Sequence, residues 1–259
     1  MYFCAMLIDT HTHLYVSEFD DDRDVMIQRA LDSGVSQFVL PAIDAETTEA
    51  MHALKRDYPN NMHLMMGLHP THVNANYKEA LNHVYQQLKT HNFVAVGEIG
   101  MDLYWDKTYQ KEQQQAFAQQ IEWALSFDLP IVIHCREAFD EIFEVLENVK
   151  DKRLRGIFHC FTGNASQAQR VISHNMLLGI GGVVTFKNSG LAETLAQVPL
   201  NHIVLETDSP YLAPVPYRGK RNESSYLACI SAKIAKVYGI SEENVAKITT
   251  QNAKQLFNI

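Results

Sequence analysis

Short apolar runs rich in Val, Ile and Leu recur along the chain, and amphipathic stretches separate them. Continuous apolar runs of this length are typical of strands that are buried on both faces, as in a parallel sheet. We predict strands at Ala5–Asp9, Gln37–Ala42, His63–Leu68, Val94–Glu98, Pro130–His134, Gly156–His159, Leu177–Gly181 and Ile203–Asp208.

The stretches between these runs have the pattern of helices. Asp21–Ser33 begins with acidic residues and is followed by Gly34, as helix polarity favours. Ser241 is a typical N-cap for a last helix, which we expect to end near Thr250. The other expected helices are Ala45–Tyr58, Tyr77–Thr90, Gln110–Phe127, Glu137–Val149, Ala165–His174, the short Leu191–Gln197 and Ser225–Tyr238.

Strands that alternate with helices form either a closed barrel or a doubly wound open sheet. Polar residues at the carboxyl ends of five runs favour the barrel, because strand ends converge there on one axis. Closure would bring His11 and His13 beside Asp208, whereas an open sheet would keep the first and last strands far apart. The 259 residues suit this fold and contain no linker, so we predict an α/β protein, a single (β/α)8 TIM barrel over residues 1–259.

The residues at these strand ends are types that bind divalent metals. Each has an ordinary alternative: a surface pair for His11 and His13, a hydrogen-bonded core residue for a lone His, and a salt bridge for Glu98. Together they exceed the three or so protein ligands of one catalytic metal, which predicts two metals. We assign His11, His13 and Asp208 to one cation, His134 and His159 to the other, and Glu98 to a bridging position.

Other residues near the same strand ends are candidates for contact with substrate. Arg136 could grip a phosphate with its forked guanidinium group, or could pair with Glu98 or Asp102. His69 and Asp102 are further candidates, and Asp9 could orient a ligating imidazole. Arg218, Lys220 and Arg221 follow the last strand, where TIM barrels often bind phosphate, although such a charge run can equally be solvated surface. Tyr104 and Trp105 could stack a base or pack on the barrel rim.

Charge and cysteine content narrow the function classes. The net charge of −8 excludes a broad basic surface that would bind nucleic acid by counterion release alone. The four cysteines form no CxxC pair, which argues against a zinc ribbon, and we expect Cys135 and Cys160 to point away from the site as buried thiols.

Reduced thiols predict a cytoplasmic location. Met1–Leu7 is too short for a signal peptide, no run could span a membrane, and a monomer is expected.

Several motifs in the chain match a known family. They are Asp9-Thr10-His11-Thr12-His13, Gly67-Leu68-His69-Pro70, Gly97-Glu98-Ile99-Gly100-Met101-Asp102, His134-Cys135-Arg136, His159-Cys160-Phe161-Thr162-Gly163, Glu206-Thr207-Asp208-Ser209-Pro210 and Arg218-Gly219-Lys220-Arg221-Asn222-Glu223. The sequence resembles the TatD-like metal-dependent deoxyribonucleases among the amidohydrolase-like barrels, and the motifs span nearly the whole chain in family order. Two departures are minor: Met101 stands where Leu is usual, and Ser224 stands where Pro is frequent.

The resemblance implies a TIM-barrel hydrolase with two divalent cations (Mg, Mn or Zn) held by the six residues named above. It also implies cleavage of DNA phosphodiester bonds, including 3′–5′ exonuclease action on single strands. We expect Asp208 and Glu98 to be catalytic, with Asp208 orienting or deprotonating the attacking water. One alternative is a small-molecule phosphoesterase or amidohydrolase that uses the same metals, and another is a binding or quality-control partner with weak activity.

Overall fold

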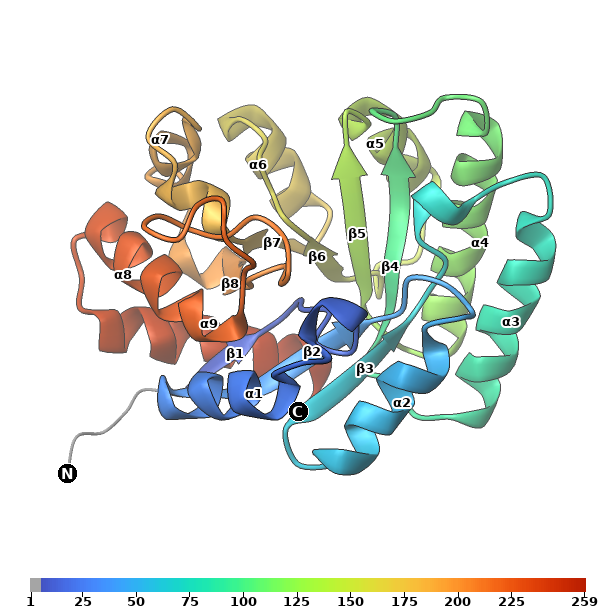
Figure 1. Cartoon of the computed structure of the whole chain (residues 1–259). Helices are drawn as coiled ribbons and strands as arrows, with labels where there is room; N and C mark the ends of the chain where they lie inside the picture. The colour runs from blue at the N-terminus through green and yellow to red at the C-terminus, as the bar shows by residue number, and fades with distance from the viewer. Residues whose placement is uncertain (1–5) are drawn as a thin grey trace.

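The structure is a computed structural model that describes residues 6–259, so Cys4 and Ala5 lie outside the described residues. It confirms all the predicted strands, which form one parallel sheet in chain order (Figure 1). The strands are β1 (Leu7–Asp9), β2 (Val35–Pro41), β3 (Met62–Met66), β4 (Ala95–Asp102), β5 (Ile131–Arg136), β6 (Gly156–Phe158), β7 (Met176–Ile180) and β8 (Ile203–Leu205).

Helices follow the strands and surround them, which confirms the barrel. They are α1 (Arg23–Asp32), α2 (Thr48–Asp57), α3 (Tyr77–Thr90), α4 (Gln110–Ser126), α5 (Phe139–Asn148), α6 (Ala165–Ser173), α7 (Leu191–Leu195), α8 (Leu227–Tyr238) and α9 (Glu242–Phe257). Short 3-10 helices lie at Ser17–Phe19, Pro70–His72, Gly182–Thr185, Leu200–His202 and Ser224–Tyr226. Helix α9 runs beyond the expected end at Thr250, because its first stop signal is the left-handed Asn258. No helix within residues 6–259 has both the length and the apolar character needed to cross a membrane.

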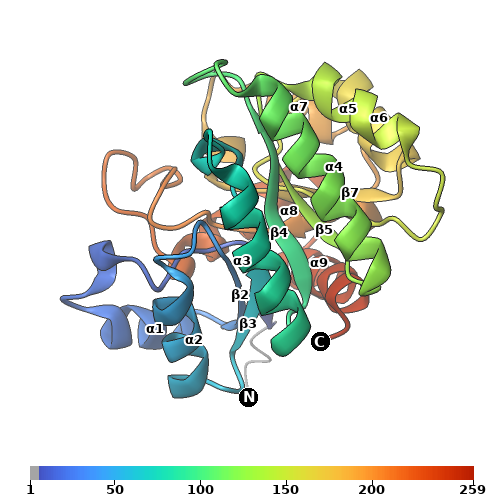
Figure 2. The same ribbon diagram turned by 90° about the vertical axis from the view of Figure 1, so that its right-hand side faces the viewer.

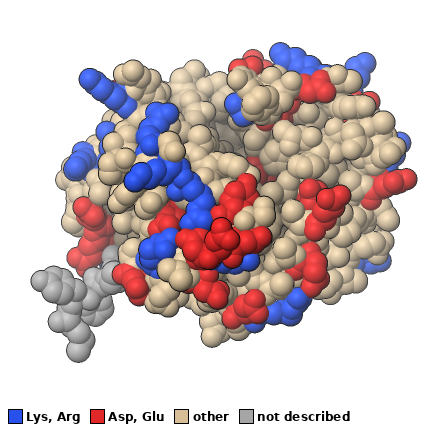
Figure 3. Space-filling view, viewed as in Figure 1, with Lys and Arg blue, Asp and Glu red and all other residues tan. Residues whose placement is uncertain are grey.

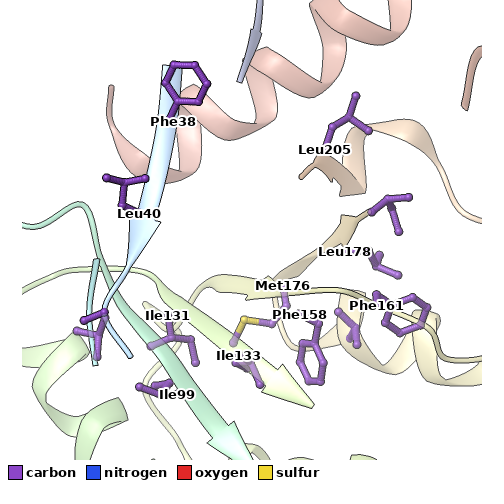
Figure 4. Close-up of a cluster of buried hydrophobic side chains, with 14 of the residues drawn as sticks. Phe38, Leu40, Ile99, Ile131, Ile133, Phe158, Phe161, Met176, Leu178 and Leu205 are labelled. Carbon is purple, nitrogen blue, oxygen red and sulfur yellow. The ribbon is translucent and has the colours of Figure 1, made fainter. Parts of the chain in front are cut away.

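Two apolar clusters hold the barrel and its helices together. The outer cluster fills the space between strands and helices, and Figure 4 shows part of it, including Phe38, Ile133 and Leu178. Figure 2 shows helices α3 and α4 side by side, with α3 on the outside of β3 and α4 on the outside of β4. The inner cluster contains one residue from each strand, and Ala253 and Phe257 of α9 pack against it. The inner residues are Ile8, Val39, Met65, Ala95, Val132, Ile157, Leu177 and Val204.

A polar layer lies above the inner apolar layer because side chains two residues apart in a strand share a face. His134 follows Val132 on the inner face of β5, and Glu206 follows Val204 beyond β8. His159 stands in the same relation to Ile157, just past the end of β6. Along the barrel axis, the inward-facing side chains therefore change from apolar to polar at one level.

Strand β4 reaches the same polar layer only because its register is irregular between Val96 and Ile99. Both of these residues pack into the outer cluster although they are three positions apart. Such an irregularity re-aims the side chains that follow it, so Glu98 joins the inner face. Glu98 and His134 lie within their strands, which continue to Asp102 and Arg136, and the predicted ends of these two strands were too early.

Hydrogen bonds beyond the strand ends join the last strand to the first. The Thr10 amide donates to the Leu205 carbonyl at 3.1 Å, and the Asp208 amide donates to the His11 carbonyl at 2.9 Å. The fully buried Asp9 carboxylate accepts from the Thr207 amide at 2.9 Å and from the Thr207 hydroxyl at 2.6 Å. It also accepts from the Ser224 hydroxyl at 2.7 Å. The expectation that Asp9 orients an imidazole was wrong, because its oxygens are occupied in closing the barrel.

Replacement of Asp9 should destabilise the fold. Asp9→Ala removes the acceptor of three buried hydrogen bonds and should lower the free energy of unfolding by about 3 kcal/mol or more. Asp9→Asn keeps one acceptor oxygen, so its free energy of unfolding should fall less. Urea denaturation of both variants tests this, with the exposed Asp21→Ala as a control that should stay within about 0.5 kcal/mol of the parent. A loss in Asp9→Ala no larger than in the control contradicts the role of this carboxylate.

Candidate metal centre

A cavity of about 620 Å³ lies at the carboxyl ends of the strands. Its wall contains most of the residues that the sequence analysis selected, and the space-filling view shows the molecule hollowed on this face (Figure 3). The selected residues that line it are His13, His69, Glu98, Asp102, His134, Arg136, His159 and Asp208. His11 is completely buried behind this wall.

Glu98 lies at the centre of a group of imidazoles. His11 Nε2 is 3.0 Å from Glu98 Oε2, and His134 Nδ1 is 2.7 Å from Glu98 Oε1. The Nε2 atoms of His69 and His159 lie 3.4 and 3.6 Å from the same Oε1. Burial by itself would raise the pKa of Glu98, but these imidazoles hold it well below its ordinary value. The carboxylate is therefore charged and has both oxygens directed at nitrogen atoms.

Asp208 meets the histidines of the first strand. Its Oδ1 lies 3.5 Å from His13 Nε2, 3.8 Å from His159 Nε2 and 4.0 Å from His11 Nε2. The residue has the left-handed backbone conformation (φ 58°), which Asp tolerates better than most side chains. The ligand-type atoms of His11, His13 and Asp208 all lie within 4.8 Å of one another. Barrel closure thus brings the first and last strands to one point, as predicted.

His159 is held from behind by a carboxylate that the sequence analysis did not select. Its Nδ1 lies 2.9 Å from Glu206 Oε1, which also accepts the Cys160 amide at 2.6 Å. Burial would lower the pKa of His159, but the carboxylates of Glu206, Glu98 and Asp208 raise it to about 10. Its Nε2 is left facing Glu98 and Asp208. The available signal was a second carboxylate, at position 206, inside the apolar run that leads to Asp208.

Tyr15 was also missed, and it orients His13. The Tyr15 hydroxyl donates to the Pro41 carbonyl and lies 3.3 Å from His13 Nδ1. Because the hydroxyl proton is used by Pro41, the tyrosine oxygen accepts from Nδ1, and His13 Nε2 keeps a free lone pair toward Asp208. Nothing in the sequence near Tyr15 indicates this role, which depends on the position of β2.

Asp102 holds His134 and the loop that follows β4. Its Oδ2 lies 2.9 Å from His134 Nε2, and its Oδ1 accepts the Tyr104 amide at 3.1 Å. Asp102 was selected as a substrate-binding residue, but both of its oxygens are engaged within the protein. His69 was selected for the same role and contacts His134 directly, with 3.3 Å between His69 Nε2 and His134 Nδ1.

Unpaired buried nitrogens show that the donor set fits divalent cations. The rings of His11 and His159 stack with centroids 3.5 Å apart. Both nitrogens of the buried His11 lack a hydrogen-bond partner, and the 3.0 Å approach of its Nε2 to Glu98 is outside hydrogen-bonding geometry. Buried polar atoms without partners are costly, and a cation among imidazoles and carboxylates would satisfy them.

The four candidate basic residues occupy two different places. Arg136 lines the cavity and stacks on Tyr104, with the guanidinium carbon 3.9 Å from the ring centroid, rather than pairing with Glu98 or Asp102. Arg221 instead pairs with Asp22 at 2.7 Å, and Arg218 stacks on Phe186. The exposed Lys220 is not among the cavity-lining residues either. Figure 3 shows basic and acidic side chains side by side below the hollow, and paired charge of this kind offers little to a phosphate.

The expectation for the cysteines was wrong at Cys160. Strand β6 ends at Phe158 and Cys160 has φ 45°, so strand alternation no longer applies and the residue lines the cavity. Burial, together with the Asp208, Glu206 and Glu98 carboxylates, raises the pKa of the Cys160 thiol well above its usual value. Cys135 packs against the outer cluster and also reaches the cavity wall. Within residues 6–259 the cysteines form no disulfide.

Comparison with known proteins gives consistent results. The profile of the TatD related DNase family matches residues 8–258. The chain is 37% identical to a Bacillus subtilis protein named as an uncharacterized metal-dependent hydrolase, YabD, over 98% of this chain and 100% of that protein. It is 29% identical to the 3′-5′ ssDNA/RNA exonuclease TatD of Erwinia tasmaniensis, with the same coverage.

The solved structures include a similar molecule. The crystal structure of YjjV, a TatD homologue from Escherichia coli, superposes with a TM-score of 0.93 at 29% identity, covering 99% of this chain and 100% of that one. The polar layer described above is thus set in a barrel that this relative shares. The chain therefore belongs to the TatD-related DNase family of metal-dependent hydrolases.

Proposed function

We propose that the protein hydrolyses phosphodiester bonds of single-stranded nucleic acid, principally DNA, with the aid of two divalent cations. The observation that carries the proposal is the convergence of His11, His13 and Asp208 beside Glu98 in a cavity that Arg136 also lines. The family is described as TatD related DNase, and the Erwinia relative is named for exonuclease action on single strands. A 3′–5′ direction is part of the proposal.

The proposed ligands divide between two cations. His11, His13 and Asp208 would hold one, and their ligand-type atoms already lie together. His134 and His159 would hold the other, with Glu98 shared, because Glu98 Oε1 faces both of these imidazoles. Asp102 occupies Nε2 of His134, which leaves Nδ1 toward Glu98. His69 contacts both Glu98 and His134, so it would support the second position.

The chain's own groups then have separate tasks in the reaction. Divalent cations in such a site lower the pKa of water and offset the charge that develops on phosphate. Asp208 would orient the attacking water and accept its proton, because three imidazoles outweigh the effect of burial and lower the pKa of its carboxyl group. Arg136 would hold a phosphate oxygen with its forked donors. Glu206 and Tyr15 would keep His159 and His13 correctly oriented.

Removal of metal should abolish hydrolysis. Protein treated with a chelator should lose cleavage of a single-stranded oligonucleotide, and Mg, Mn or Zn should restore it when added back. Elemental analysis of the untreated protein should find about two metal ions per chain. A simple lactone and a small phosphomonoester, assayed in parallel, distinguish a nuclease from the other hydrolases, since the proposal requires the oligonucleotide to be the better substrate. Full activity in the chelated protein would contradict it.

Asp208→Asn should nearly stop turnover without unfolding the chain. The amide keeps the shape but cannot accept the proton, so kcat on an oligonucleotide should fall about 100- to 10,000-fold. Thermal unfolding and circular dichroism check that the barrel is retained. Asp21→Asn is the matched control on an exposed loop and should keep the parent's rate. A normal rate in Asp208→Asn would remove this residue from the mechanism.

Two glycines beside Glu206 provide a matched pair for testing its role. A Cβ on Gly179 would collide with Glu206 Oε2, whereas the nearest atom to a Cβ on Gly181 is 3.7 Å away. Gly179→Ala should displace Glu206 from His159 and weaken metal binding about 10- to 100-fold, as is usual when a ligand loses its supporting carboxylate. Gly181→Ala should retain the affinity. Titration of both variants with metal measures this, and equal affinities would show that Glu206 does not support the site.

The finer expectations from the sequence stay predictions. They are a cytoplasmic location, a monomeric state and the choice among Mg, Mn and Zn. Phosphate binding by Arg218, Lys220 and Arg221 also stays a prediction, outside the cavity proposed here. These three residues lie outside the cavity lining, and Arg221 is committed to Asp22.

A further inference from the structure

An exposed aromatic pair stands at the mouth of the metal cavity. Tyr104 is 49% exposed and Trp105 is 70% exposed, on the loop that follows β4. Their rings meet edge to face with centroids 4.8 Å apart, and Trp105 lines the cavity. Large aromatic surface left in water beside a functional cavity is typical of a binding surface.

The loop that carries this pair is fixed to the metal centre. Asp102 Oδ1 accepts the amides of Tyr104 and Trp105 at 3.1 and 3.4 Å, while Asp102 Oδ2 contacts His134. The Gln113 side chain of α4 bonds to the Asp102 backbone in both directions, at 2.9 and 3.2 Å. The backbone that carries the two rings is therefore held at a set position relative to the candidate ligands.

Arg136 contacts both rings and also lines the cavity. Its guanidinium carbon is 3.9 Å from the Tyr104 ring centroid and 5.0 Å from that of Trp105. Within the described part of the chain, no carboxylate forms a salt bridge with it, so its N–H groups remain available for a ligand. On the other side of the cavity Tyr211 and Leu212 are also exposed.

The cavity offers few basic groups to an anionic substrate. The net charge is −8, and Arg136 is the only Lys or Arg among the described residues that line the cavity. A polyanion cannot be held here by a basic groove, so any binding energy beyond that of the metal level and Arg136 must come from the faces of its bases. Every nucleobase offers a π face, which stacking on neighbouring base pairs covers inside a duplex and which a single strand can expose.

We propose that Tyr104, Trp105 and Arg136 form a subsite that stacks an unpaired nucleobase next to the reacting phosphodiester. The inference rests on the proposed function, since it names how the substrate of that site is recognised. Trp105 supplies the stacking face, Tyr104 supports the Arg136 guanidinium, and Arg136 binds the adjoining phosphate. The subsite recognises single strands and tolerates any base.

The test compares two substrates with the same backbone. One is an oligothymidylate, and the other carries abasic residues at the positions next to the cleaved bond. The parent enzyme should prefer the thymidylate, and Trp105→Ala should reduce the ratio of the two kcat/KM values about 5- to 150-fold, the range expected for stacking of one base. Trp105→Phe should restore most of the preference. An equal loss on both substrates in Trp105→Ala would show a structural role only and would overturn the proposal.

A binding measurement separates this proposal from the proposed function. The chain has two tryptophans, and Trp123 lies on α4 against Tyr85, so Trp123→Phe leaves Trp105 as the sole indole and serves as the control for catalysis. In that background the oligothymidylate should quench Trp105 fluorescence, and the abasic strand should not. Base-dependent quenching without cleavage would preserve the subsite and refute the nuclease. Cleavage with no difference in quenching between the two strands would refute the subsite.

Discussion

Closure of the barrel between its first and last strands is the constraint on which the site depends. The backbone hydrogen bonds from Thr10 and Asp208, and the Asp9 carboxylate with its three donors, join segments about 200 positions apart. The same contacts place Asp208 beside His11 and His13. Because Asp9 is two residues from His11, a change in how the barrel closes would also displace the candidate ligands. Stability and chemistry are therefore coupled at this junction.

The fold also gathers carboxylates and imidazoles in one buried site. Glu98, Glu206 and Asp208 lie among imidazoles rather than water, and each removes part of the desolvation cost of its neighbours. The compensation is incomplete, since both His11 nitrogens, His159 Nδ1 and Glu206 Oε2 are not in hydrogen-bonding geometry with any partner. A site organised in this way is prepared for cations, and the supporting residues limit how far the imidazoles can turn. This agrees with the metal-dependent hydrolases among its relatives.

The surroundings of the cavity differ in character from its floor. Apolar and aromatic side chains such as Trp105 and Tyr211 form the rim, while carboxylates and imidazoles form the base. Most of the basic residues near the last strand are occupied in pairs or stacks, Arg221 with Asp22 among them. An acidic protein of this kind can attract an anionic substrate only at the level of the candidate metal ligands and through Arg136. The rim is left to contact the uncharged parts of the substrate.

The periodicity of apolar residues was enough to predict every strand, and the polar residues at the strand ends indicated the barrel and selected the six candidate ligands, because these are local features. Strand β4 was predicted to end at Glu98, since its irregular register and continuation to Asp102 depend on pairing with β5. Tyr15 and the true partners of Asp9 could not be found, because each acts on residues brought near only by the fold. Glu206 carried a signal in the sequence, but its contact with His159 depends on the fold. Residue type and spacing determine which groups can bind a metal, and packing in three dimensions decides which groups hold them in place.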